Sequence, residues 1–453
     1  MALSNSNSSA LPEPPQPDGH PVIGNALTFV GANDPVRFLN KMCQEHGDIL
    51  KMEMFGSEYY ITRNPDDAQR IFHDNNDNYM KSERQKKVFE NFWGEDILSS
   101  EDDLWQHQRD VLTPLISKGK AKSIGPHIME YTEEMTASWN DGEVVDIHKE
   151  MMALTIRVVC KAVFNWDASE YGESIGHNLK VATSHLFRNS MGVSVPEWVP
   201  TPQNRRYQNA VETLDSIADE IIRTRKLADD DADDLITRSL DMRDQVDRNI
   251  NHNVLREKVK TMLFAGHETT AQGLTFSLYL LARHPKVVRR LRNEFDEEID
   301  GQEPSPDDLP NLEYLDAVFK EVLRLYSPAY SVNREPLNDD ELSGYHISAG
   351  RPVIVFQWGI QRNPRVWDDP YAFDPDRWMK ESNPCDHEYG YVPFAMGPRR
   401  CLGQGFAEVE SKLILAKVLQ EYDLELDTEP PIELDWAVTT RPKNGIDMIP
   451  YRR

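Results

Sequence analysis

The sequence predicts a mainly α-helical protein with a smaller β-rich portion, and three observations support this fold class. Apolar residues recur at helical spacing over most of residues 100–300. An alternating apolar and polar stretch at 49–63 indicates a pair of short strands with a turn near Gly56. After residue 326, short strand-like runs and proline-rich loops dominate until helical spacing resumes at residue 403.

The helices are predicted in order along the chain. The first begins at Asp34 and Pro35, a favourable N-cap followed by a first-turn proline, and stops at a glycine. A long helix spans 254–283, and Pro285 then starts the next one. Its second half is apolar on all sides, which predicts burial at the protein centre. The remaining candidate helices are 105–116, 148–164, 205–227, 312–326 and 403–422.

Length and charge limit the classes of protein. A chain of 453 residues allows about three domains or one large helical fold. The formal net charge of -26 excludes a generic nucleic-acid binder, because phosphate recognition needs a basic surface. This charge fits either adaptation to high salt, as in a halophile, or an ordinary acidic cytosolic protein.

The N-terminal segment indicates neither secretion nor membrane anchoring. Residues 1–20 are rich in Ser, Asn and Pro and predict a flexible lead-in without a signal-peptide pattern. No run reaches the roughly 18 apolar residues of a membrane span. The four cysteines, Cys43, Cys160, Cys385 and Cys401, are too widely spaced for a disulfide framework or a zinc site. We therefore expect a cytoplasmic protein without a membrane anchor.

The segment FAMGPRRCLG, residues 394–403, places Cys401 in an unusual setting. A lone cysteine is most often a small buried hydrophobic residue. Here Gly397 and Gly403 permit tight turns and close approach by a bulky group, and a helix starts directly afterwards. The helix amides and the charges of Arg399 and Arg400 are expected to lower the thiol pKa.

With Phe394, Gly397, Arg399, Cys401 and Gly403 at these positions, the segment resembles the haem-binding signature of the cytochromes P450. The resemblance implies one haem domain over 21–453, a helical bundle around haem b with a long central helix and short antiparallel sheets. It implies that Cys401 is the axial iron ligand, that Phe394 packs beside its sulfur and that Arg399 binds a propionate. A thiolate ligand favours O–O cleavage by the iron.

Three further segments, AGHETT, EVLR and FDPDRW, match the same family in the expected order. Glu321 and Arg324, one helical turn apart in EVLR, would by themselves indicate a surface ion pair. The resemblance instead joins them to Arg377 of FDPDRW in a buried network that secures the haem loop. Burial of Glu321 distinguishes the two interpretations, and both are structural.

The segment AGHETT places an acid and two threonines in the middle of the long apolar helix. A threonine in mid-helix often bonds back to the preceding turn. The resemblance gives Ala265 and Gly266 the face beside haem, where the helix widens, and makes Glu268 and Thr269 the acid and alcohol that deliver protons during oxygen activation. His267 is expected to pack rather than to bind metal.

Other site residues follow from position within the resemblance. Trp105 and Arg109, four apart on one helix face, match residues that bind a haem propionate, although an aromatic core residue beside a solvated arginine is the simpler interpretation. Arg334 matches an arginine on the second propionate. The expected substrate contacts are Leu98, Ala265, Ala329 and Val332, and residues 185–202 resemble a mobile lid over the access channel.

The predicted reaction is hydroxylation or epoxidation of a hydrophobic small molecule of fatty acid, terpenoid, steroid or carotenoid type. Dioxygen is the co-substrate, and NAD(P)H electrons arrive through an external ferredoxin and ferredoxin reductase. Lys118, Lys120 and Lys122 are predicted to dock an acidic ferredoxin, although lysines scattered in solvent would give the same pattern. A monomer is expected.

Three alternatives stay open from the sequence. A haem-thiolate peroxygenase or isomerase would need the Glu268 and Thr269 pair less. A non-catalytic haem sensor or electron carrier would turn over no substrate. In a third interpretation, without haem, Cys401 is structural.

Overall fold

The structure is a computed structural model and describes residues 11–20, 24–25, 34–54, 56–190, 195–228, 232–241, 251–380 and 384–453. Its contacts divide the chain into two compact units. Unit 1 comprises Met1–Glu83, Tyr330–Pro370 and Cys385–Arg400, and unit 2 comprises Arg84–Ala329, Tyr371–Pro384 and Cys401–Arg453. Each unit is described by itself, and the single domain expected over 21–453 stays a prediction.

Unit 1 is built on a five-stranded mixed sheet in the order β1-β2-β8-β5-β3. The predicted strand pair at 49–63 is confirmed as an antiparallel hairpin, with Ile49 opposite Thr62. Only the pairing of β2 with β8 is parallel. Side chains of the sheet, α3 and the following π-helical turn form an apolar core that includes Tyr60, Phe72 and Val353. The strands are β1 (Ile49–Met54), β2 (Ser57–Thr62), β3 (Tyr79–Met80), β5 (Val332–Pro336) and β8 (Val353–Val355).

Short helices and a second hairpin complete unit 1. The side chain of Asp34 caps α2 (Pro35–His46) by accepting a hydrogen bond from the Arg37 amide, as the sequence predicts. The other elements are α3 (Pro65–Gln69), a π-helical turn (Arg70–Asp74), 3₁₀ turns (Asn76–Asn78 and Glu388–Gly390), β6 (Asp340–Leu342), β7 (Tyr345–Ile347) and α15 (Gln357–Ile360).

The predicted flexible lead-in is wrong for its second half. The Pro15 carbonyl accepts a hydrogen bond from the Lys51 amide, and the Pro12 carbonyl accepts one from the His346 amide. These bonds attach residues 11–20 to β1 and β7, so the prolines serve as extended, hydrogen-bonded chain rather than as a free tail. Residues 1–10 lie outside the described part of the chain.

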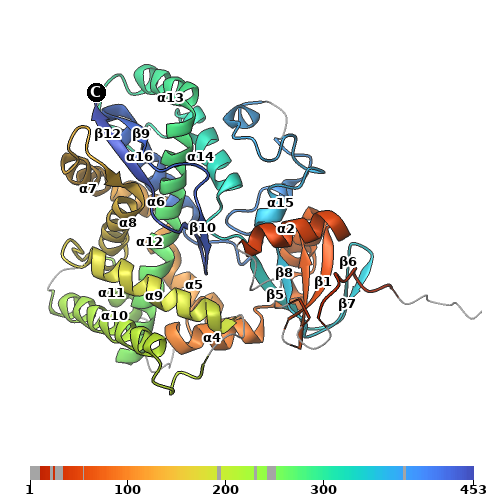
Figure 1. Cartoon of the computed structure of the whole chain (residues 1–453). Coiled ribbons are helices and arrows are strands. Elements are labelled where there is room, and N and C mark those ends of the chain that lie inside the picture. Colours follow the sequence, from red (N-terminus) through yellow and green to blue (C-terminus); the bar gives the residue numbers. More distant parts are fainter. Residues whose placement is uncertain are drawn as a thin grey trace, which may run out of the picture. The chain divides into compact units, whose positions relative to one another are not determined.

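Unit 2 is helical and is organised around α12 (His252–Arg283), which Figure 1 shows in the middle of the helices. Helices α8, α9, α10, α14 and α16 all contact α12. The helix spans expected from the sequence are confirmed to within a few residues. These are α5 (Asp102–Leu112), α8 (Ile147–Phe164), α10 (Pro202–Leu227), α12 itself, α13 (Pro285–Glu298), α14 (Glu313–Leu325) and α16 (Gln404–Glu421). The sequence analysis did not predict α4 (Glu83–Trp93), α6 (Lys118–Ser123), α7 (Gly125–Ala137), α9 (Gly172–Ser190) and α11 (Leu235–Asp241) as separate helices.

Unit 2 also contains 3₁₀ turns and small antiparallel sheets. Strands β4 (Val145–Asp146), β12 (Asp447–Arg452) and β9 (Tyr422–Leu426) form one sheet in that order. Strands β10 (Leu434–Trp436) and β11 (Thr440–Pro442) form a hairpin in which Asp435 lies directly opposite Arg441. The 3₁₀ turns are Thr113–Ile116, where Pro114 ends the preceding helix, and Pro375–Trp378. The mainly helical fold class with small sheets is thereby confirmed.

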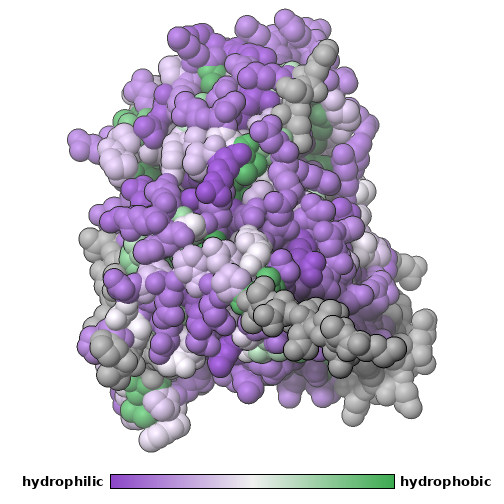
Figure 2. Space-filling model, turned by 90° about the vertical axis from the view of Figure 1, so that its right-hand side faces the viewer, coloured by the Kyte–Doolittle hydropathy of each residue, from purple (hydrophilic) through white to green (hydrophobic). Residues whose placement is uncertain are grey.

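The surface agrees with the acidic composition. On the face drawn in Figure 2, hydrophilic residues predominate among those described and apolar ones are scattered. Among the described residues, none of the helices is both long enough and apolar enough to cross a membrane.

Candidate active site

The central helix has one opening in a long buried stretch. Between Lys258 and Leu281 the described residues of α12 are buried except Ala265, Gly266 and Thr269, which are half-buried. Ala265 and Thr269 are four residues apart and therefore share one helix face. The middle of a buried helix thus presents a small methyl group and a hydroxyl to a space that protein atoms do not fill.

The structure corrects two expectations for AGHETT. A Cβ on Gly266 would lie 2.4 Å from the Cγ2 atom of Val159, so this glycine allows α8 to pack closely on α12 rather than leaving room beside haem. The predicted widening of the helix is absent, because α12 is regular from end to end. The Thr269 hydroxyl donates a hydrogen bond to the Ala265 carbonyl at 3.0 Å, the back-bond typical of mid-helix threonine.

Glu268 is buried and is held from the C-terminal hairpin. Its Oε1 atom accepts a hydrogen bond from the Thr439 hydroxyl and lies 3.5 Å from the Arg441 guanidinium. Burial raises the pKa of the Glu268 carboxyl, and the Arg441 charge and the Thr439 hydrogen bond oppose that rise. His267 is buried, as expected, and its Nδ1 atom pairs with the Leu263 carbonyl.

Cys401 differs from the other cysteines. All four are free, and Cys43, Cys160 and Cys385 are buried, whereas Cys401 is an exposed residue immediately before α16. Protein atoms around its sulfur raise the thiol pKa through desolvation, against the lowering effects of the Gly403 amide and the Arg109 charge. The helix amides lower this pKa as expected, but desolvation outweighs them in the protein alone, and the charge that contributes is Arg109 rather than Arg399 or Arg400. A bound metal cation would supply the missing charge, because a coordinating thiol is deprotonated outright.

The haem-loop residues before Cys401 belong to unit 1. Phe394 and Arg399 are half-buried, and Gly397 has a φ of +74°. A Cβ on Gly397 would lie 1.8 Å from the Phe72 carbonyl oxygen, so the loop passes too close to the π-helical turn for any other residue. Gly403, in unit 2, has an ordinary φ of -85° and would place a Cβ in open space.

We expect Gly397→Ala to lower the free energy of unfolding more than Gly350→Ala does. Gly350 has a similar φ of +68°, but its Cβ would meet no atom within 4 Å. Gly350→Ala therefore measures only the left-handed backbone strain, about 1–2 kcal/mol. Gly397→Ala adds the collision with the Phe72 carbonyl oxygen. Denaturant unfolding of both variants checks this, and equal losses would contradict it.

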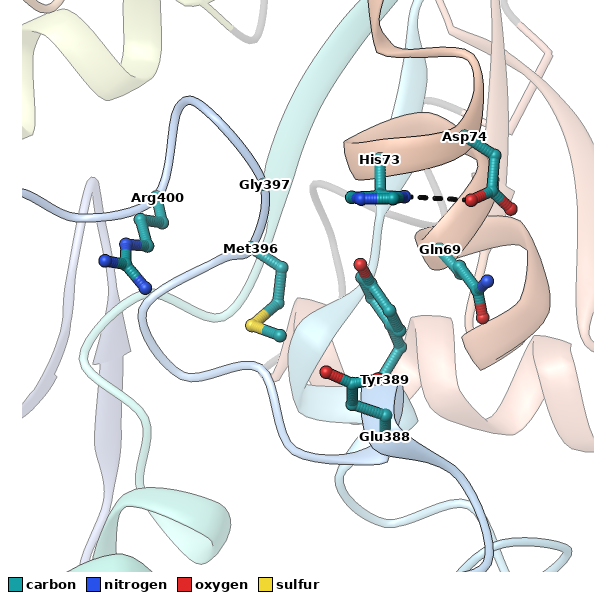
Figure 3. Close-up of a pocket in the computed structure, with 8 residues that line it drawn as sticks. All are labelled: Gln69, His73, Asp74, Glu388, Tyr389, Met396, Gly397 and Arg400. Atoms are coloured by element: carbon teal, nitrogen blue, oxygen red, sulfur yellow. Dashed lines mark hydrogen bonds and ion pairs between the residues drawn. The ribbon is translucent and has the colours of Figure 1, made fainter.

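A pocket of about 350 Å³ opens in unit 1 beside the same loop. Figure 3 shows His73 hydrogen-bonded to Asp74 on one side and Met396, Gly397 and Arg400 of the loop on the other. Gln69, Glu388 and Tyr389 complete the lining. With two carboxylates, a guanidinium and an imidazole around it, this pocket lacks the apolar lining that a hydrophobic substrate needs.

The predicted propionate ligands lie in different units. In unit 2, the Arg109 guanidinium lies 5.4 Å from the centre of the Trp105 ring, which confirms that they share a helix face. In unit 1, Arg334 is buried on β5, and its guanidinium lies 5.8 Å from the centre of the Phe72 ring. Each side chain is thus held by an aromatic ring.

The EVLR and FDPDRW residues form a buried network in unit 2. Both Glu321 oxygens accept hydrogen bonds from Arg324 at 2.8 Å, and Arg377 donates to Oε1 at 3.0 Å. Glu321 and Arg324 are both 0% exposed, which excludes the surface ion pair. Trp378, which the sequence did not point out, donates from its indole nitrogen to Oε2 at 2.9 Å.

The four residues expected to contact the substrate are all half-buried. In unit 2, Leu98 lies in the turn after α4 and Ala329 follows α14, while Val332 begins β5 of unit 1. The predicted lid, 185–202, is described except at 191–194. Its second part is tied down, because the Asn204 side chain donates to the Pro196 and Val199 carbonyls at 2.9 Å.

The residues of unit 2 fit a haem group with a thiolate ligand. Cys401 is an exposed residue just before α16, a Cβ on Gly403 would meet no atom within 4 Å, and α12 is half-buried at Ala265 and Thr269. These are the features of a haem-thiolate protein. The chain belongs to the cytochrome P450 family, whose model matches residues 14–448, and is a monooxygenase of that family.

Two of the curated relatives match over most of the chain, and a third matches over less than half of it. Cyclooctat-9-en-7-ol 5-monooxygenase of Streptomyces melanosporofaciens is 29% identical over 427 residues, which cover 92% of both chains. Pentalenene oxygenase of Streptomyces avermitilis is 26% identical over 422 residues, again 92% of both chains. Cytochrome P450 4V2 of Rattus norvegicus is 38% identical over 211 residues, 46% of this chain and 40% of its own.

Sequence reasoning missed the residues around Glu268. Thr439 and Arg441 contact its carboxyl, and Asp435 and Ser184 in turn bind Arg441. The nearest of them in the sequence, Ser184, is 84 positions away from Glu268. A charged pair in a short hairpin carries no sequence signal that would connect it to a helix so far away.

Proposed function

We propose that the chain hydroxylates or epoxidises a terpenoid-type small molecule in the cytoplasm. Two relatives named above are oxygenases of this substrate type, which supports a terpenoid over a fatty acid, steroid or carotenoid. The observation that carries the proposal is the opening of α12, where Ala265 and Thr269 leave an uncovered apolar and hydroxyl-bearing surface. The four free cysteines fit a reducing cytoplasm.

The proposed haem-binding residues are Cys401 as axial ligand, Phe394 beside its sulfur, and Gly403 where the close approach needs open space. Arg399, Arg334 and Arg109 would neutralise the propionates, and the Trp105 indole would donate a hydrogen bond to one of them. When bound, haem b supplies the activation of dioxygen for insertion into a C–H or C=C bond. The substrate contacts we propose are Leu98, Ala265, Ala329 and Val332, all half-buried.

Protons for the reaction are proposed to pass through Glu268 and Thr269. Thr269 Oγ1 lies at the opening of α12 and already donates to the Ala265 carbonyl, so its oxygen can accept a hydrogen bond and orient a proton donor there. Glu268 holds its proton more strongly than an exposed carboxylic acid, because its pKa is raised. A general acid works best when its pKa lies near the working pH, and the raised pKa brings Glu268 closer to that condition than an exposed carboxyl.

A terpenoid substrate is first identified by its shift of the haem spin state. With that substrate, we expect Thr269→Ala to uncouple NAD(P)H consumption from product formation, with a severalfold fall in product formed per NAD(P)H. Thr270→Ala is the matched control, since Thr270 makes the same back-bond but is buried. Equal coupling in parent and Thr269→Ala would contradict the role of Thr269. A screen in which only fatty acids shift the spin state would contradict the substrate class.

We propose that an acidic ferredoxin docks beside Lys118. A methyl on Gly405 would lie 3.1 Å from the Lys118 Cβ, so α6 begins directly against the start of the Cys401 helix, α16. Lys118 is exposed, whereas Lys120 donates to the Asp233 carbonyl and Lys122 pairs with Asp307. Of the three predicted lysines, we therefore propose Lys118 as the main contact.

Lys118→Glu is expected to slow reduction by ferredoxin about tenfold at low ionic strength and to leave substrate affinity unchanged, because charge steers association. Stopped-flow reduction measures this. Lys286→Glu, which makes the same charge change on an exposed residue of α13, is the control. Equal slowing by both variants would show a net-charge effect and reject the docking site.

A further inference from the structure

The carboxyl of Glu268 is anchored through one oxygen only. Oε1 accepts from Thr439 and faces Arg441 at 3.5 Å. Oε2 is buried and has no hydrogen-bond partner among the residues that the structure describes. A buried polar atom without a partner is costly and needs an explanation. In a group that has to take up and release a proton, an unanchored oxygen is the atom at which the proton can be exchanged.

Arg441 is itself fixed from two sides. Its guanidinium donates to Asp435 Oδ2 at 2.8 Å and to the Ser184 hydroxyl at 2.8 Å. Asp435 lies directly opposite Arg441 in the β10–β11 hairpin, and Ser184 lies on α9. The Thr440 amide also donates to the Pro328 carbonyl, which fastens the hairpin to the chain after α14.

The hairpin connects the buried acid to the surface. The Arg441 side chain is 3% exposed and that of Glu268 2%, whereas the Asp435 side chain is 41% exposed. The charges therefore alternate from the core outward as carboxyl, guanidinium and carboxylate. A cation between two anions stabilises both, and its removal would leave Glu268 buried without its principal compensating charge.

We propose that Arg441, with Thr439, is a positioning residue that holds Glu268 through Oε1 and leaves Oε2 as the proton-exchanging oxygen. This inference rests on the proposed proton-delivery role of Glu268. It assigns to the C-terminal hairpin, which carries none of the sequence motifs, the control of how readily the acid gives up its proton.

The remaining charged and titratable groups near Glu268 do not duplicate this role. Lys180 on α9 also favours the carboxylate, but its effect is smaller than those of Arg441, Thr439 and Asp435. Burial lowers the pKa of His267 on α12 to about 4 and that of His148 on α8 to about 4. Both imidazoles are therefore neutral at neutral pH. Arg441 is the principal cation acting on the acid.

The test is a pH titration of the C=O stretching band of protonated Glu268 by infrared difference spectroscopy. The band is identified by its loss in Glu268→Gln. We expect Arg441→Met to move its midpoint upward by about one to three pH units, since an adjacent opposite charge lowers a carboxyl pKa by that amount. Arg441→Lys keeps the positive charge, so its midpoint should lie close to that of the parent protein. Thr439→Val, which removes one hydrogen bond to the carboxylate, should move it upward by less.

Asp435→Asn is the opposing variant. Removing this anion should move the midpoint downward, because Asp435 raises the Glu268 pKa and competes for Arg441. A purely structural role for the hairpin predicts equal disturbance by both variants. Midpoints that move in the same direction for Arg441→Met and Asp435→Asn, or that do not move, overturn the proposal. Should Arg441→Met fail to fold, Thr439→Val and Asp435→Asn test the proposal in its place. Their midpoints should move in opposite directions, upward for Thr439→Val and downward for Asp435→Asn.

The pH profile of product formed per NAD(P)H distinguishes the positioning role of Arg441 from the proton-delivery role of Glu268. Profiles that follow the infrared midpoints support both the positioning by Arg441 and the delivery of protons by Glu268. Midpoints that shift as expected while the profiles coincide would leave the positioning intact and reject Glu268 as the proton-delivering acid.

Discussion

Cys401→Ala is expected to abolish both the red-shifted Soret band of the reduced, CO-treated protein and its oxygenase turnover. Without the sulfur, no thiolate can bind the iron at this position or supply the electron density that favours O–O cleavage. Cys401 is an exposed residue outside the buried core, so the fold should persist. The absorbance spectrum and product analysis of the purified variant measure the effect, and a fall in turnover of at least about a thousandfold is expected.

Cys385→Ala is the matched control. Cys385 is also free, but it is buried and its thiol donates to the His387 carbonyl. It should keep the red-shifted band. Retention of both the red-shifted band and the turnover by Cys401→Ala would contradict the assignment of Cys401 as the axial ligand. Loss of helical circular dichroism in that variant would instead show that the cysteine supports the fold.

Glu321→Gln is expected to lower the free energy of unfolding by about 3–5 kcal/mol, the usual result of removing one partner from a buried ion pair. The substitution preserves the volume but leaves the Arg324 and Arg377 guanidinium groups buried without their shared anion. It also weakens the acceptor of the Trp378 indole and the Asp374 amide. Denaturant unfolding followed by circular dichroism gives the value.

Asp376→Asn provides the comparison in the same segment. Asp376 pairs with Arg290, but their side chains are 57% and 46% exposed. Solvent screens such a pair, so the loss should stay within about 1 kcal/mol. If Glu321→Gln lowers the free energy of unfolding no more than Asp376→Asn does, the buried network does not stabilise the folded chain.

The sequence predicted most helices because their determinants are local. Pro285 ends one helix and begins the next, and Asp34 caps α2 through its own side chain. The alternation at 49–63 specified the β1–β2 hairpin for the same reason. The expectations that were wrong concern segments whose structure depends on contacts with residues far away in the sequence. Pro12 and Pro15 read as a flexible tail, yet backbone bonds to β7 and β1 hold them.

The site shows the same division. The residue types around Cys401 indicated a haem ligand, but the predicted low thiol pKa neglected desolvation by surrounding protein, which raises it. Gly266 was assigned to the haem face because it stands beside Ala265. In the helix it faces Val159 of α8, a contact that depends on how two helices cross.

The sequence alone determined the family, the cysteine and the order of the helices, because motif spacing and hydrophobic period are properties of neighbouring residues. Only the tertiary structure decided that Glu321 is wholly buried, that α12 is open at Ala265 and Thr269, and that Arg441 meets Glu268 from 173 positions further along the chain. Burial and long-range pairing are set by the packing of the whole chain, in which residues distant in sequence exclude water from one another.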